Sequence, residues 1–187
     1  THGLVDGVLQ LKKKHGFHER DVARVESHVP SLTHRLIGRP SKAGMTPGYA
    51  RLSGQYVVAS AILGDGVGVE DFKPDALMDA RRLALAAMVH ININDNPDPN
   101  ALAPLRVAII LQNGQRLEID LDKVYGAPAN PMTHEAHLAK FRKNFASASP
   151  VVPAAQGEAL IAAIDDIENV KDVRTLIDLC MANGGKA

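Results

Sequence analysis

The sequence predicts an α+β fold, in which a small antiparallel sheet with packed helices is followed by a purely helical segment. Apolar residues recur at helical spacing in some stretches and alternate with polar residues in others. Two alternating runs flank Asn113-Gly114, a pair typical of a tight hairpin turn. With 187 residues, 45% of them hydrophobic, the chain is long and apolar enough to form a buried core.

Residues 1–126 are expected to form the α+β unit. The first helix stops at Gly16, after a last turn rich in lysine, where cations suit the helix dipole. Residues 49–63 are apolar on nearly all sides, which indicates a buried helix. In chain order, the patterns predict a helix over 4–15, a helical turn at 19–21, a strand over 23–29, an irregular loop over 30–47, helices over 49–63 and 75–87, a strand over 88–93, and the hairpin strands 105–111 and 117–121.

Residues 130–187 are expected to be helical throughout. A breaker segment rich in glycine and proline, 126–131, separates them from the first unit. Thr133 is a suitable N-cap for a helix that runs to Phe145. Two more helices are predicted over 158–169 and 172–181, with Asn183-Gly184-Gly185 as the final stop. Three short helices make a thin core, so we expect this segment to pack on something outside these residues.

Composition excludes several classes of function. Lysine and arginine total 21, as do aspartate and glutamate, and a neutral chain is not suited to non-specific nucleic-acid binding. No apolar run approaches the ~20 residues of a transmembrane helix. The single cysteine, Cys180, indicates a reducing compartment, and we expect a cytoplasmic protein. His134 and His137 lie three apart on one predicted helix without an evident third ligand, so no metal site is expected.

The residues alone leave the polar side chains in and around loop 30–47 as candidates for a site. Arg39, Lys42 and Arg51 are placed to hold a carboxylate-rich small molecule through charge-assisted hydrogen bonds, or they are ordinary surface charges. The full set of candidates is His28, His34, Arg35, Arg39, Lys42, Tyr49, Arg51, Ser53, Gln55 and Tyr56.

Several ordered motifs add a family resemblance. They are the stretch from Thr1 to Gly7, Gly38-Arg39-Pro40, the stretch from Ala50 to Ala59, the Asn113-Gly114 hairpin, and Asn130-Pro131-Met132-Thr133 followed by Lys140-Phe141-Arg142. In order and spacing they resemble the MmgE/PrpD family, enzymes that use no cofactor and act on small di- and tricarboxylates. Members include 2-methylcitrate dehydratase, cis-aconitate decarboxylase and an iminodisuccinate epimerase.

The resemblance implies an architecture and a set of roles. Residues 1–126 correspond to an α+β lid domain, and residues 130–187 to the closing helices of an all-α domain whose larger part precedes Thr1. His2 matches the active-site histidine, a general acid/base at the cleft between the domains. Arg39, Arg51 and Ser53 are expected to bind substrate carboxylates, with no cofactor and no metal, in a homodimer. Some members carry a tyrosine where this chain has Thr33 to Leu36, so either His34 takes its place or the chemistry differs.

Three functions stay open at this point. The first is a lyase of the MmgE/PrpD type, inactive as the isolated 187 residues because the site needs both domains. The second is an isomerase or epimerase of the same family, which also abstracts a proton next to a carboxylate. The third is a binding module without chemistry.

Overall fold

The computed structural model describes residues 1–182, and its contacts divide the chain into two compact units. The first unit spans Thr1–Pro131 and the second begins at Met132. The mixed helix and sheet content confirms the predicted α+β class. The predicted stop at Asn183-Gly184-Gly185 lies outside the described residues.

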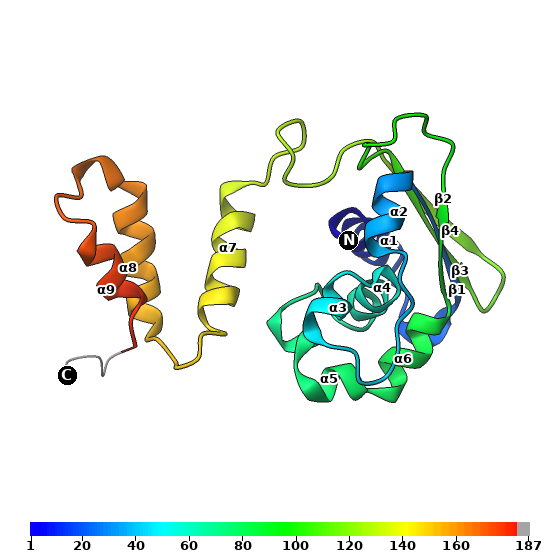
Figure 1. Cartoon of the computed structure of the whole chain (residues 1–187), viewed down its shortest axis with the longest axis horizontal. Coiled ribbons are helices and arrows are strands. Elements are labelled where there is room, and N and C mark those ends of the chain that lie inside the picture. The colour runs from blue at the N-terminus through cyan, green and yellow to red at the C-terminus, as the bar shows by residue number, and fades with distance from the viewer. Residues whose placement is uncertain (183–187) are drawn as a thin grey trace. The chain divides into compact units, whose positions relative to one another are not determined.

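The first unit places its helices on one face of a four-stranded sheet (Figure 1). Its strands are β1 Val22–Val29, β2 Val89–Ile93, β3 Leu105–Leu111 and β4 Arg116–Leu121. Its helices are α1 His2–His15, α2 Ser31–Ile37, α3 Pro47–Arg51, α4 Gly54–Leu63, α5 Pro74–Met78 and α6 Ala80–Ala87. Short 3-10 turns at Glu19–Asp21 and Val69–Phe72 complete the unit.

The sheet is mixed, with the strand order β2-β1-β3-β4. Strand β1 pairs antiparallel with β3, which forms the predicted hairpin with β4 across Asn113-Gly114. Strand β2 pairs parallel with β1, so the expected all-antiparallel sheet was wrong at this strand. The chain between β1 and β2 forms helices on one face of the sheet, and such a crossover brings the next strand back in the same direction.

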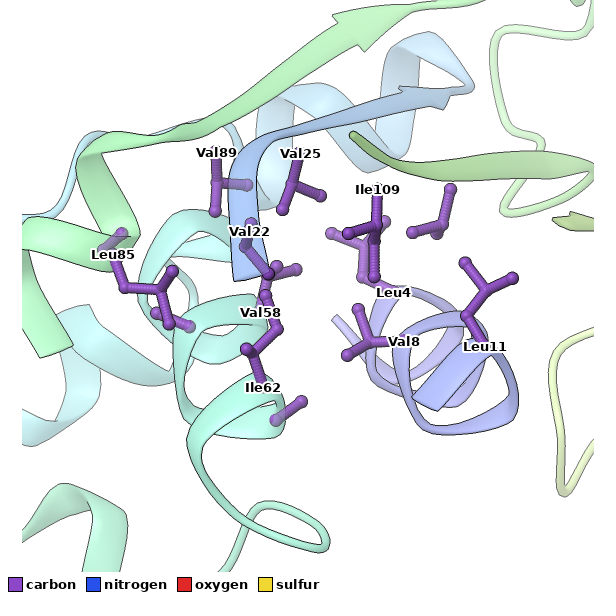
Figure 2. Close-up of a cluster of buried hydrophobic side chains, with 14 of the residues drawn as sticks. Leu4, Val8, Leu11, Val22, Val25, Val58, Ile62, Leu85, Val89 and Ile109 are labelled. Carbon is purple, nitrogen blue, oxygen red and sulfur yellow. The ribbon is translucent and has the colours of Figure 1, made fainter. Parts of the chain in front are cut away.

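The core lies between this sheet and helices α1, α4 and α6 (Figure 2). Leu4, Val8 and Leu11 of α1 meet inward-facing residues of the sheet such as Ile109. Fully burying an aliphatic side chain contributes about 1.5–3 kcal/mol, so this interface dominates the stability of the unit. It therefore fixes the first turn of α1, and with it His2, against the sheet.

Ion pairs cover the other face of the sheet. Glu26 of β1 accepts a hydrogen bond from Arg116 at 2.7 Å and forms an ion pair with Arg24 at 2.6 Å, and Arg116 also donates to Glu118 at 2.9 Å. The hydrogen bond from Arg116, followed by the charge of Arg24, lowers the pKa of Glu26. This face thus presents paired charges of both signs.

Three predicted segments differ from the structure because capping residues were read as loop or helix interior. Within the predicted loop 30–47, residues Ser31–Ile37 form helix α2, whose last turn closes when Gly38 donates its N–H to the carbonyl of His34. Proline is compatible with a helix start and glycine with a helix end, so a short helix fits between Pro30 and Gly38.

The two long predicted helices of the first unit are each interrupted by an N-cap. Helix α3 ends at Arg51, and Ser53 caps the start of α4 by accepting the N–H of Tyr56. Asp79 does the same before α6, accepting the N–H groups of Arg81 and Arg82. The short polar side chains of serine and aspartate accept hydrogen bonds from nearby backbone N–H groups, so these residues favour the N-cap position over the interior of a helix.

The second unit is helical, as expected. It consists of α7 His134–Phe145, α8 Ala154–Asp165, a 3-10 turn Ile167–Asn169 and α9 Arg174–Cys180. Thr133 caps α7 by accepting the N–H of Ala136, and α8 begins four residues before its predicted start. Arg142 and Glu158 join α7 to α8 through two hydrogen bonds of 2.7 and 2.8 Å.

Candidate active site

Three helix ends converge at Gly54, the first residue of α4. An ideal Cβ placed on Gly54 would lie 3.2 Å from the carbonyl oxygen of Ile37, 3.2 Å from Cδ1 of Leu4, and in overlap with Ile91. Only glycine lets the start of α1, the end of α2 and the start of α4 approach this closely. Three of the predicted site residues lie around this junction. His2 stands two residues before Leu4, Arg39 stands two residues after Ile37, and Ser53 directly precedes Gly54.

His2 is the first residue of α1 and is exposed. It lies beside a small pocket of about 130 Å³ between the starts of α1 and β3 and one side of α2. The walls are formed by Thr1, His2, Gly3, Leu4, Thr33, Leu36, Ile37, Leu102, Leu105 and Val124. The proposed acid/base is therefore an exposed group on the edge of a mostly aliphatic hollow.

Arg39 and Lys42 share one aromatic ring. The guanidinium carbon of Arg39 lies 5.1 Å from the ring centre of Tyr49, and Nζ of Lys42 lies 5.2 Å from it. The hydroxyl of Tyr49 donates to the carbonyl of Pro40 at 2.9 Å, which fixes the ring against the loop. Tyr49 thus gathers two cations that come from the loop after α2.

Arg51 has a second aromatic partner, Phe72, with 5.4 Å between its guanidinium carbon and the ring centre. Phe72 and Tyr49 both pack on a small buried cluster formed by Met45, Ala50, Tyr56 and Leu77. This cluster, distinct from the main core, therefore supports the rings beneath all three cations. We call Arg39, Lys42 and Arg51 the cation patch.

No member of the cation patch forms an ion pair with a carboxylate among residues 1–182. Arg82, Arg106 and Arg116 of the first unit each have an acidic partner, whereas the exposed candidate Arg35, like the cation patch, has none among these residues. A cation held over an aromatic face keeps its hydrogen-bond donors available. The patch can therefore bind an anion without first breaking an internal salt bridge.

Ser53 is completely buried, and its hydroxyl is already engaged. It donates to the carbonyl of Arg39 at 3.1 Å and accepts the N–H of Tyr56 at 3.4 Å. A backbone bridge between Gly38 and Ser53 lies beside these bonds. Ser53 was expected to touch the substrate carboxylate, whereas the contacts it makes in the structure hold the backbone of Arg39.

His34 lies in the last turn of α2 and is half-buried. Its Nε2 atom lies 3.0 Å from an ideal Cβ on Gly38, so the ring packs against the end of the helix. The described residues that line the pocket beside His2 include Thr33, Leu36 and Ile37 of α2, and His34 is not among them. The structure thus groups Arg39 with Lys42 and Ser53, and places His2 and His34 on different sides of α2.

Several other sequence candidates have structural partners. Gln55 accepts the N–H of Ser41 at 2.9 Å and donates to the carbonyl of Val89 at 3.0 Å, which ties the loop to β2. Tyr56 is buried and donates to the carbonyls of Asp71 and Ala76, and burial raises the pKa of its hydroxyl. Sequence reasoning did not single out Thr33, whose buried position no local pattern indicates.

Within residues 1–182, no group of three histidine, cysteine, aspartate or glutamate residues is arranged to hold a metal ion. No helix in the same range combines the length and the apolar character needed to cross a bilayer.

The family profile described as MmgE/PrpD C-terminal domain matches residues 1–169. The chain belongs to this family. The match covers the whole first unit and continues through α7 and α8 of the second. No curated protein gives a match to the chain. Membership in the MmgE/PrpD family is compatible with a dehydratase or another lyase.

Proposed function

We propose that this MmgE/PrpD domain forms one wall of the active site of a cofactor-independent lyase that acts on a small di- or tricarboxylate. The observation that carries the proposal is the cation patch, three cations that rest on aromatic rings and have no carboxylate partner among residues 1–182. A substrate with two or three carboxylates supplies the partners that these cations lack. Bidentate hydrogen bonds from arginine suit such groups in particular.

In this proposal Arg39 and Arg51 bind substrate carboxylates, and Ser53 positions Arg39 through its backbone carbonyl. His2, at the exposed start of α1, acts as the general acid/base that moves a proton during dehydration or decarboxylation. An imidazole is suited to this role because it exchanges a proton near neutral pH. His34, packed against Gly38, stays a second candidate for proton transfer.

The decisive experiment measures turnover of 2-methylcitrate and cis-aconitate by the complete gene product. We expect His2→Ala to abolish turnover, because general acid/base catalysis typically contributes a factor of about 10²–10⁴. His90→Ala is the matched control, since His90 is exposed on strand β2 and touches neither the pocket nor the cation patch. Turnover that survives His2→Ala at the level of the control would contradict the assigned role.

The same assay tests whether the site is shared between domains. We propose that the 187 residues alone are inactive, because further active-site groups lie outside this sequence. Turnover by the isolated chain would refute the shared site. Racemisation or epimerisation of a carboxylate substrate, without loss of water or carbon dioxide, would assign an isomerase instead.

We also propose that helices α7 to α9 belong to an all-helical domain completed by residues outside this sequence. They line a groove of about 530 Å³ whose walls are mainly apolar, and Ile177 beside it is 57% exposed. Cys180 also lines the groove and is exposed in the structure. We expect a thiol reagent to modify Cys180 in the isolated chain and to leave it unmodified in the complete protein, as read by peptide mass spectrometry.

A further inference from the structure

The pocket beside His2 contains one buried hydroxyl that has no partner. Thr33 lines the pocket from α2, is 8% exposed, and its Oγ1 makes no hydrogen bond within the described residues. Thr33 lies in the first turn of α2, so the carbonyl four residues before it belongs to Val29 of strand β1, which accepts the N–H of Asn94 at 2.8 Å. No preceding turn of the helix therefore offers this hydroxyl a carbonyl, as it would for a threonine further along a helix.

A buried hydroxyl without a partner is unfavourable, so its persistence in a pocket points to a ligand group that completes it. The pocket volume of about 130 Å³ is roughly four times the ~30 Å³ that one water occupies in the liquid. It therefore has room for one end of a small molecule.

The charge of the walls decides which end can enter. The side chains that line the pocket include no lysine, arginine, aspartate or glutamate, and most are aliphatic. A carboxylate there would find no lysine or arginine side chain to offset the loss of its hydration, which is costly. The cation patch lies after the end of α2, where carboxylates find their partners. The pocket consequently suits an uncharged part of the substrate that still carries an oxygen.

We propose that Thr33 is a specificity-determining residue, whose hydroxyl forms a hydrogen bond with the hydroxyl group of a hydroxycarboxylate substrate beside His2. The aliphatic walls contact the carbon that carries this hydroxyl and any short alkyl group on it. The inference rests on the proposed function, because it assumes that the carboxylates of the same molecule bind at the cation patch.

The test compares two tricarboxylates that differ only in a hydroxyl group, citrate and tricarballylate. Their dissociation constants are measured by titration calorimetry on the complete gene product and on its Thr33→Val and Thr33→Ser variants. We expect the unmodified protein to prefer citrate. Thr33→Val keeps the shape of the side chain but removes the hydroxyl, and should reduce this preference by about tenfold, the effect of one hydrogen bond. Thr33→Ser keeps the hydroxyl and should retain the preference.

The outcomes separate the two proposals. If both compounds bind but Thr33→Val leaves their ratio unchanged, or the unmodified protein shows no preference, the assignment of Thr33 is overturned while the proposed function stands. If neither compound binds and no carboxylate is turned over, the proposed function itself fails. Thr33→Val should melt at an equal or higher temperature than the unmodified protein, because it removes an unpaired buried hydroxyl. A lower melting temperature combined with an unchanged ratio would also contradict the proposal.

Discussion

Replacing Arg82 with methionine should lower the free energy of unfolding of the first unit and should also weaken substrate binding at the cation patch. Arg82 of α6 donates to Oγ of Ser60 at 2.6 Å and to Oδ1 of Asp71 at 2.7 Å. The side chains of Arg82 and Asp71 are only 13% and 18% exposed. Methionine keeps the unbranched apolar stem of the side chain and lacks the guanidinium, so the change removes the charge and its hydrogen bonds more than the packing.

The expected cost follows from the carboxylate that is left behind. Breaking a fully buried ion pair by removing one partner costs about 3–5 kcal/mol. Here Asp71 keeps some contact with water and still accepts the N–H of Gly68 at 2.7 Å, which reduces the cost. We therefore expect a loss of about 2–4 kcal/mol, a large part of the ~5–15 kcal/mol that stabilises a typical domain.

The assay is urea unfolding of Arg82→Met, Asp71→Asn and the double variant. Removing both charges leaves no unpaired ion, so the double variant should be more stable than the sum of the single changes implies. Arg81→Met is the matched control. Arg81 pairs with Glu19 from a side chain that is 65% exposed, and such surface pairs contribute at most about 1 kcal/mol.

A cost below about 1 kcal/mol for Arg82→Met, or single changes that add within about 0.5 kcal/mol, would refute this reasoning. The substitution should also raise KM for the carboxylate substrate. Asp71 directly precedes Phe72, and the ring of Phe72 supports Arg51. An unchanged KM in a measurably destabilised variant would show that Arg51 does not depend on this network.

Three further predictions follow from the fold and the site. The pKa of Glu26 is lowered by Arg116, so the stability that this carboxylate adds is present above its ordinary pKa of 4.5 and is lost as the pH falls through the lowered value. Glu26→Gln should therefore flatten the acid limb of a plot of melting temperature against pH, and an unchanged acid limb would contradict the assigned ion pair. Gly54→Ala should cost about 1–3 kcal/mol by urea unfolding, because the added methyl overlaps Ile91, whereas Gly48→Ala, with open space around its Cβ, should not be strained in this way. Tyr49→Leu should raise KM several-fold by removing the ring under Arg39, while Tyr49→Phe keeps the ring and should stay closer to the unmodified protein; equal effects of the two changes would assign the role to the hydrogen bond at Pro40.

The elements that sequence predicts best are those whose signal is local. Asn113-Gly114 supports a tight turn by its backbone preferences alone, and the hairpin follows directly. The parallel pairing of β1 with β2 carries no local signal, because it depends on where the intervening helices pack. Ser53 and Asp79 were read as helix interior although each is a strong N-cap residue, since the apolar pattern around them continues across the break.

In the candidate site, too, local features could be predicted and those that depend on tertiary packing could not. Arg39, Lys42 and Arg51 could be selected from the sequence as a loop-borne group of cations, but their aromatic partners could not. Tyr49 lies close to the loop in sequence, whereas Phe72 comes from a distant turn that only tertiary packing brings under Arg51. The unpaired hydroxyl of Thr33 lies in the first turn of α2, and its burial depends on tertiary packing that no local pattern reports.

The bridge between Gly38 and Ser53 has a consequence for how this family can diversify. It closes the base of the segment that carries Arg39, Lys42 and Tyr49, so the ends of the segment stay joined whatever lies between them. The length of a closed surface loop has little effect on the free energy of folding. Insertions and deletions in the more exposed part of this segment, residues 40–44, should therefore leave the sheet and its helices intact, whereas Met45 and Ala50 further along belong to the buried cluster. In the proposed function, such changes would alter which anion the cation patch binds.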